Sequence, residues 1–307
     1  GGVLAVLILA ETGIHGIVSI TDNGTANRDI YVESEQEIGG LLESAGVDQV
    51  DYRTAIVNPL VRNEEILYQL NGMSMYSSTN TEEMWNFVKN MGFENLENRF
   101  QYAGSTEVMD MLLGIRYLFC RNTRTFHTAY KKIAESQSFD LYENPRALRS
   151  GYMVSDSVLD YAMEGTDPLE VQNRLLSGIV GKRLYKMQTV NSDTALIGNT
   201  TFNIHLKKGE HGYLYIPGTE PDTVTINGQE QKSDYWNNNF LDLGTYNVDT
   251  IVQVTTGTGM HEAVLGTYQE SELDSIYEEL SSQQMDLKDG KGSISVKKDG
   301  ILMLSVF

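Results

Sequence analysis

The sequence contains little cysteine, little proline and little positive charge. Cys120 is the only cysteine among 307 residues, so no internal disulfide can form. It ends the apolar run YLFC, which predicts a buried structural thiol rather than a nucleophile. Five prolines and the absence of a long low-complexity run argue against a disordered tail.

Basic residues are outnumbered by acidic ones, 23 to 42, which gives a net charge of −19. Such a surface repels nucleic-acid phosphates and anionic lipid head groups. We therefore expect no nucleic-acid partner. The charge suits an exposed domain in water.

Signatures of catalysis are also missing. The sequence has no P-loop, no GxGxxG after a strand, and no GxSxG, HExxH or CxxC motif. We predict no catalytic residue, no cofactor and no metal ligand. The histidines are scattered, and two of them, His205 and His211, bracket a predicted hairpin turn where we expect both to face solvent. Carboxylates are so numerous that a paired-acid mechanism needs geometry before it can be argued.

Long apolar runs are confined to the first 22 residues. Residues 3–10 are apolar throughout, and residues 13–20 continue the run with His15 inside it. A membrane helix needs ~20 mostly apolar residues, and Glu11 and His15 interrupt this one. Two interpretations stay open: the trailing part of a transmembrane helix, or a short buried strand or helix of a soluble core. The leading glycine without a methionine favours the first.

The length predicts two domains, and residues 23–186 are predicted to form a mixed α/β domain. Helices are expected at 33–45, 82–91, 105–114 and 167–181, and strands at 49–57, 66–70, 115–120, 129–143 (a hairpin) and 151–154. The helix at 167–181 begins with Asp-Pro, a strong helix-start signal. We expect it to link the two domains.

Residues 187–262 are predicted to form an antiparallel β-sandwich domain. Short alternating strands recur between Gly, Pro and Asn turns, and Asn227–Gly228 marks a hairpin. Residues 263–307 are predicted to hold a helix at 271–282 and then the start of a further β module that is truncated at Phe307. Alternatively, the last strand completes the first sandwich. The predicted class is α+β.

Two loops are candidate ligand sites. The first, in a Gly/Ser/Tyr stretch before a capped helix, has the donors that a polar or anionic ligand needs, from Ser74, Tyr76, Ser77, Ser78 and Asn80. The second presents aromatic faces flanked by amides, as carbohydrate sites do, from Tyr235, Trp236 and Asn238. The alternatives are an ordinary strand-to-helix connection and a polar β-loop with one packing tryptophan.

Several stretches, in order, resemble the extracytoplasmic region of the bacterial YfhO membrane-protein family. LNGMSMYSSTN resembles its loop before a helix, GSTEVMDMLLGIRYL its helix-to-strand segment, and LYENPRAL followed by GYMV its "YENP.AL" stretch. They lie at 70–80, 104–118, 141–148 and 151–154, and residues 268–280 and 300–306 resemble the family's later helix and strand. The shared order of these motifs carries the resemblance.

The resemblance implies a polytopic protein similar to C-type glycosyltransferases, associated with sugar transfer from lipid carriers to cell-envelope polymers such as teichoic acids. It implies an outward-facing domain at the cell membrane, attached through the N-terminal segment. Its expected partner is a cell-envelope glycan or a lipid-linked sugar. The family's preceding membrane helices and early loop with a catalytic acid are absent, and SVF stands where the family continues into Pro-Tyr and Gly-Trp. No catalytic residue is therefore transferred.

The leading hypothesis is a non-catalytic domain that recognises the glycopolymer acceptor, within a parent glycosyltransferase that uses lipid-linked sugar. One alternative is a self-contained carbohydrate-active enzyme with paired carboxylates. The other is a structural spacer or carbohydrate-binding module.

Overall fold

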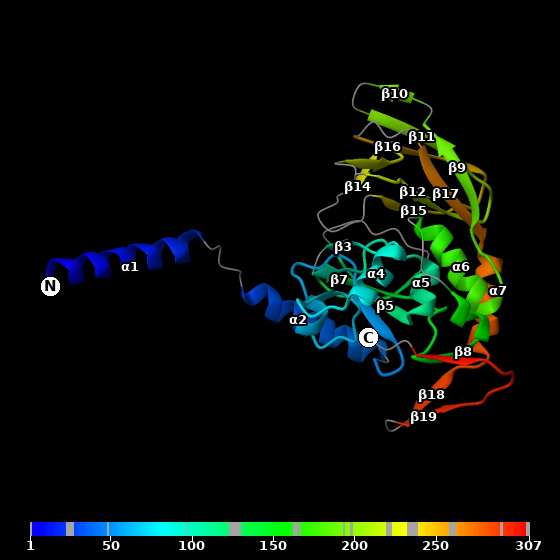
Figure 1. Cartoon of the computed structure of the whole chain (residues 1–307), viewed down its shortest axis with the longest axis horizontal. Coiled ribbons are helices and arrows are strands. Elements are labelled where there is room, and N and C mark those ends of the chain that lie inside the picture. Colours follow the sequence, from blue (N-terminus) through cyan, green and yellow to red (C-terminus); the bar gives the residue numbers. More distant parts are fainter. Residues whose placement is uncertain are drawn as a thin grey trace.

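The structure is a computed structural model of the chain (Figure 1). It describes residues 2–22, 28–47, 49–96, 98–122, 130–161, 165, 167–192, 194–196, 199–218, 223–231, 239–257, 262–288 and 291–304. Helices and mostly antiparallel sheets are both abundant, which confirms the predicted α+β class.

The first helix, α1 (Gly2–Asp22), extends away from the rest of the molecule in Figure 1. Its window Gly2–Ser19 is long and apolar enough to cross a membrane, and none of it is buried. The interpretation of this segment as part of a soluble core is therefore wrong, because the leucines and isoleucines of Gly2–Ser19 are exposed.

A mixed four-stranded sheet forms the centre of the following part, in the order β1-β5-β7-β6. These strands are β1 (Arg53–Ile56), β5 (Ile115–Arg121), β7 (Phe139–Glu143) and β6 (Lys131–Glu135), and only the β1–β5 pairing is parallel. Alternate side chains face opposite sides of a strand. Phe119 accordingly packs towards α2 (Arg28–Ala45), and Leu118 towards α5 (Glu107–Leu112).

Short elements beside this sheet carry the first candidate loop. They are α3 (Glu64–Leu67), α4 (Glu82–Asn90) and a three-stranded sheet of β2 (Met75–Tyr76), β4 (Arg99–Phe100) and β3 (Asn95–Leu96). The predicted strand at 66–70 is wrong, because α3 and a turn occupy this stretch. Asn63 begins the helical turn in the left-handed conformation, and the Glu64 carboxylate accepts the Leu60 N–H at 2.6 Å.

The predicted linking helix is α6 (Pro168–Val180), capped by Asp167, whose Oδ1 accepts the Leu169 N–H at 3.0 Å. On one side, the Gln172 amide donates to the Met91 carbonyl at 2.7 Å. On the other, Leu169 lies so close to Gly266 that a Cβ there would come within 2.9 Å of its Cδ1. The helix therefore contacts both the α/β part and a strand of the later sheets.

Two antiparallel sheets follow. One contains β10 (Thr194–Leu196), β11 (Asn199–Leu206), β16 (Thr250–Thr256), β13 (Val224–Ile226) and β14 (Gln229–Gln231). The other contains β15 (Phe240–Thr245), β12 (Glu210–Tyr215), β17 (Glu262–Gln269) and β9 (Lys186–Asn191). Phe202 and Val252 from the first sheet share one apolar cluster with Leu214 and Leu265 from the second. The predicted hairpin at Asn227–Gly228 is confirmed, with positive φ at both residues.

The last part of the chain returns to the α/β part. After α7 (Glu270–Ser281) come the hairpin β18 (Met285–Lys288) and β19 (Lys291–Ile294), then β20 (Ile301–Leu304). β20 pairs with β8 (Gly151–Val154), which is followed by a 3₁₀ turn, η1 (Asp156–Asp160). The expectation that this strand completes the first sandwich is therefore wrong. Gly300 fits where a side chain would overlap the Val154 carbonyl, so this pairing requires the glycine.

A buried ionic cluster joins the α/β part to the second sheet. Arg146 lies 3.3 Å from Glu107 of α5, 2.9 Å from Glu270 of α7 and 2.7 Å from Asp274. His211 of β12, 1% exposed, lies 2.9 Å from a carboxylate oxygen of Asp242. The expectation that His211 faces solvent is wrong, whereas His205 is exposed as predicted.

Charge explains why a histidine is tolerated there. Burial lowers the pKa of His211, but the carboxylates of Asp242, Glu270 and Glu107 outweigh it and raise the pKa to about 10. The ring is therefore an imidazolium at neutral pH. It also stacks against Tyr268, whose hydroxyl donates to Glu107 at 3.0 Å.

We expect Arg146→Ala to lower the free energy of unfolding by about 3 kcal/mol, because it takes the guanidinium away from the buried carboxylate of Glu107 and from the more exposed Glu270 and Asp274. The matched control is Arg183→Ala, which removes an exposed pair with Glu170 and should cost less than about 1 kcal/mol. Urea denaturation of both variants measures the difference. Equal losses of unfolding free energy in the two variants would show that the cluster stabilises the fold no more than an exposed ion pair does.

Candidate functional site

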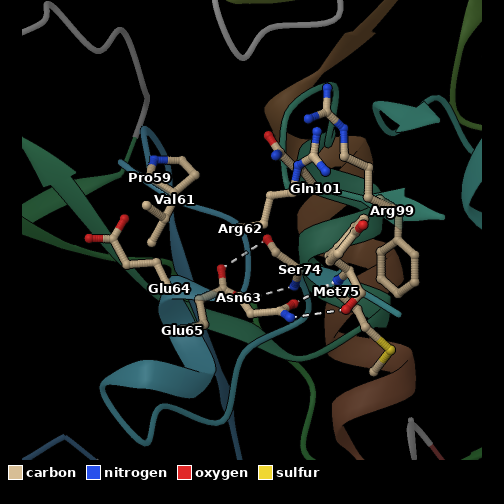
Figure 2. A pocket seen from close by; sticks show the side chains of 12 residues that line it. Pro59, Val61, Arg62, Asn63, Glu64, Glu65, Ser74, Met75, Arg99 and Gln101 are labelled. Carbon is tan, nitrogen blue, oxygen red and sulfur yellow. Dashed lines mark hydrogen bonds between the residues drawn. The ribbon is translucent and has the colours of Figure 1, made fainter. Parts of the chain in front are cut away.

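A pocket forms where three segments of the α/β part meet (Figure 2). Its lining comes from the stretch entering α3, from β2 and from β4: Pro59, Val61, Arg62, Asn63, Glu64, Glu65, Ser74, Met75, Tyr76, Arg99, Phe100 and Gln101. The empty space at the pocket, about 280 Å³, includes the open solvent at its mouth. The pocket is therefore an open depression of the surface rather than an enclosed cavity.

The Glu65 carboxylate fixes the floor of this pocket. It is 2% exposed and accepts the Ile56 N–H at 3.0 Å, the Ser74 N–H at 2.7 Å and the Ser74 hydroxyl at 3.0 Å. Burial raises its pKa to about 7 despite these bonds. Gly72 passes over it so closely that a Cβ would overlap the carboxylate.

Ser74 connects this carboxylate to a second buried acid. Its hydroxyl oxygen accepts the Tyr102 N–H at 3.3 Å, and the Tyr102 hydroxyl donates to Asp110 at 2.9 Å. Asp110 also accepts the hydroxyls of Tyr130 and Ser105, at 2.8 and 2.6 Å. Burial again raises the pKa of this acid to about 7.

Asn63 holds Tyr76 in place by reciprocal bonds. Its amide donates to the Tyr76 carbonyl at 2.9 Å, and its oxygen accepts the Tyr76 N–H at 2.6 Å. The guanidinium of Arg62 lies over the Tyr76 ring, 4.7 Å from its centre, as cation–π pairs do. An exposed cation is thus seated on a fixed aromatic ring at the edge of the pocket.

β4 supplies polar atoms whose hydrogen-bonding capacity is not used up. Arg99 pairs with Glu94 at 3.3 Å through one terminal nitrogen, while its buried Nε–H finds no acceptor among the described residues. Gln101, which follows β4, is 5% exposed. Its Oε1 has no hydrogen-bond partner among the described residues. In Figure 2 the side chains of Arg62, Arg99 and Gln101 point toward the same side of the pocket.

The predicted loop contributes two of its five candidates to this lining, Ser74 and Tyr76. Ser77, Ser78 and Asn80 lie outside it, towards α4. Thr81, not Asn80, caps that helix through its hydroxyl oxygen, which accepts the Met84 N–H at 3.3 Å. The candidates Tyr235, Trp236 and Asn238 lie outside the described residues. Whether any of these residues binds a ligand stays a prediction.

Sequence reasoning missed Arg62, Arg99 and Gln101. Arg62 lies in the connection before α3, and the other two lie in a polar stretch with no recognisable motif. Only the pairing of β2 with β4, in which Met75 lies opposite Phe100, brings them to one place. No local signal could have indicated this.

A second group, Glu107, His211 and Glu270, places possible metal-ligating atoms within 4.8 Å of one another. Arg146 contacts both carboxylates, and a nitrogen of the His211 ring lies 2.9 Å from a carboxylate oxygen of Asp242, so groups of the protein already engage these side chains. We assign this group a structural role, in which it joins the α/β part to the second sheet.

The thiol of Cys120 is buried, as predicted. Burial raises its pKa to about 12, which leaves it protonated and unreactive at neutral pH.

Comparison with protein families matches the chain to the bacterial membrane protein YfhO over residues 2–306. The chain belongs to the YfhO family. This confirms the resemblance carried by the motifs at 70–80, 104–118 and 141–148 and places the chain in a family of bacterial membrane proteins. No curated protein and no solved structure matches it.

We expect Gly72→Ala to lower the free energy of unfolding by about 1–3 kcal/mol, because the new methyl group must displace the anchored Glu65 carboxylate. Gly39→Ala is the matched control. Gly39 lies within α2 with nothing near its Cβ position, so alanine should stabilise the protein by ~1 kcal/mol. Thermal melting of both variants tests this, and a neutral Gly72→Ala would contradict the packing described.

Stability should fall as the pH rises from 5.5 to 8. Glu65 and Asp110 have folded-state pKa values of about 7, above their ordinary values, so the folded state binds more protons in this range. Their stabilising effect is complete at low pH and is lost as the pH passes 7. His211, with a folded-state pKa of about 10, acts in the same direction above pH 6.5.

Asp110→Asn keeps an acceptor for the tyrosine hydroxyls but cannot ionise. The fall in melting temperature between pH 5.5 and 8 should shrink in this variant and stay unchanged in the exposed control Glu170→Gln. An undiminished fall in Asp110→Asn would show that this acid is ionised at low cost.

Proposed function

We propose that this chain is a non-catalytic, outward-facing part of a glycosyltransferase-like membrane protein, and that it recognises a cell-envelope glycopolymer acceptor at the pocket in Figure 2. The observation that carries the proposal is the composition of the pocket. Ser74 and Tyr76, from the 70–80 stretch that resembles the family, line it together with Arg62 and Arg99.

The anchor in this proposal is α1. The helix has the length and hydropathy of a membrane span, and none of its window Gly2–Ser19 is buried. Together with membership of a bacterial membrane protein family, this supports attachment to the bilayer through residues 2–22. The net charge of −19 favours a domain held in water, away from anionic head groups.

Recognition is favoured over catalysis because the carboxylates of the pocket are committed elsewhere. Glu64 pairs with the buried Arg121 and accepts the Tyr68 hydroxyl at 3.0 Å. Glu65 accepts three bonds from the chain itself. A glycosidase needs two carboxyl groups that flank the scissile bond, whereas the oxygens of these two are engaged by groups of the protein itself. The alternative of a self-contained enzyme gains no support at this pocket.

The test is titration of the full chain, in mild detergent, with purified teichoic acid from a bacterial envelope, followed by calorimetry. We expect Arg62→Ala combined with Tyr76→Ala to weaken binding at least tenfold, because both side chains lie at the mouth of the pocket. Arg183→Ala, which removes the same charge from a distant exposed pair, should leave binding unchanged.

Absence of binding by the unaltered chain would contradict the proposal and favour a structural spacer. Binding that survives the double substitution would move the site away from this pocket.

A further inference from the structure

The pocket holds more hydrogen-bond donors and positive charge than the fold uses. Arg62 has a cation–π contact with Tyr76 but no ion pair with a carboxylate among the described residues. One terminal nitrogen of Arg99 pairs with Glu94, whereas its buried Nε–H has no acceptor among the described residues. A buried donor left unpaired costs about 1–3 kcal/mol, so a ligand that accepts from it recovers that energy.

The carboxylates around the pocket do not cancel this charge. Glu64 is neutralised by Arg121 and buried beneath the pocket. Glu65 has a pKa of about 7 and turns its oxygens towards Ile56 and Ser74. Arg62 and Arg99 outnumber Glu94 by one charge, and the oxygens of Glu65 face their own hydrogen-bond donors, so the side of the pocket with the two arginines favours an anion.

We propose that Arg62 and Arg99 bind the oxygens of a phosphodiester, and that Gln101 accepts a hydrogen bond from a hydroxyl group beside it. Guanidinium groups present planar N–H forks that match phosphate oxygens, which an ammonium group does not. Gln101 is more than nine-tenths buried, with Oε1 unpaired among the described residues, so it offers an acceptor rather than another donor.

This inference deepens the proposed function and rests on it only for the source of the ligand. The same chemistry occurs in a phosphate-containing envelope polymer and in the head group of a phospholipid. The net charge of −19 repels both at long range, but at physiological salt this field is screened within about 8 Å. Contact chemistry therefore decides binding.

The experiment titrates the full chain in detergent with four probes: glycerophosphoglycerol, inorganic phosphate, glycerol and glucose. We expect glycerophosphoglycerol to bind most tightly, inorganic phosphate more weakly, and the neutral probes not at all. Arg62→Ala should weaken the phosphodiester at least tenfold. Arg99→Lys, which keeps the charge but loses the planar fork, should also weaken it. Arg183→Ala should have no effect.

Binding of glycerol or glucose as tight as that of the phosphodiester would overturn the inference, as would phosphodiester binding that is unaffected by Arg62→Ala. Melting temperatures establish that each variant is folded. Because Arg99 also pairs with Glu94, the result for Arg62→Ala decides the question if Arg99→Lys fails to fold.

Two further arms separate this inference from the proposed function. If a neutral envelope glycan binds as tightly as teichoic acid, the phosphodiester assignment fails and acceptor recognition stands. If the phosphodiester binds but teichoic acid does not, acceptor recognition fails and the site stands. Titration with short-chain phosphatidylglycerol in the same detergent, compared with the uncharged detergent alone and repeated with Arg62→Ala, tests a lipid head group as the source.

Discussion

The candidate site depends on one buried carboxylate. Glu65 accepts the N–H of Ile56 in the central sheet and both donors of Ser74, so a single side chain ties the sheet to the loop that lines the pocket. Burying this carboxylate costs free energy, and the same burial raises its pKa to about 7. That cost is offset because the carboxylate supplies three hydrogen bonds that no apolar residue could replace. Gly72 is required beside it, since any side chain would overlap the carboxylate.

Buried charge also joins the two halves of the molecule. Arg146 and the imidazolium of His211 share the carboxylates of Glu107 and Glu270, which come from elements on either side of the junction. Apolar packing continues across the same boundary, where Tyr213 of the second sheet belongs to the same core cluster as Met109 of α5. Ionic and apolar contacts therefore join α5 to the second sheet, so the two halves form one continuous packed unit.

The sequence predicted those elements whose signals are local. Thr81 and Asp167 cap their helices because capping depends on the next few residues. The strand expected at 66–70 failed because Glu65 finds its partners in other segments, which periodicity cannot reveal. His211 was expected to be exposed for the same reason, since the carboxylates that retain its charge come from distant parts of the chain. Arg99 lies at the site because β2 pairs with β4, and nothing in the sequence near Arg99 predicts that pairing.

Hydrogen–deuterium exchange of the full chain, with and without teichoic acid, tests the central claim most directly. We expect slower exchange of backbone amides at 60–65, 74–76 and 99–101, where the three segments of the pocket meet. We expect no change around the exposed pair of Arg183 and Glu170. Protection confined to residues 232–238, the stretch that contains Tyr235 and Trp236, would contradict it and place recognition at the aromatic loop instead.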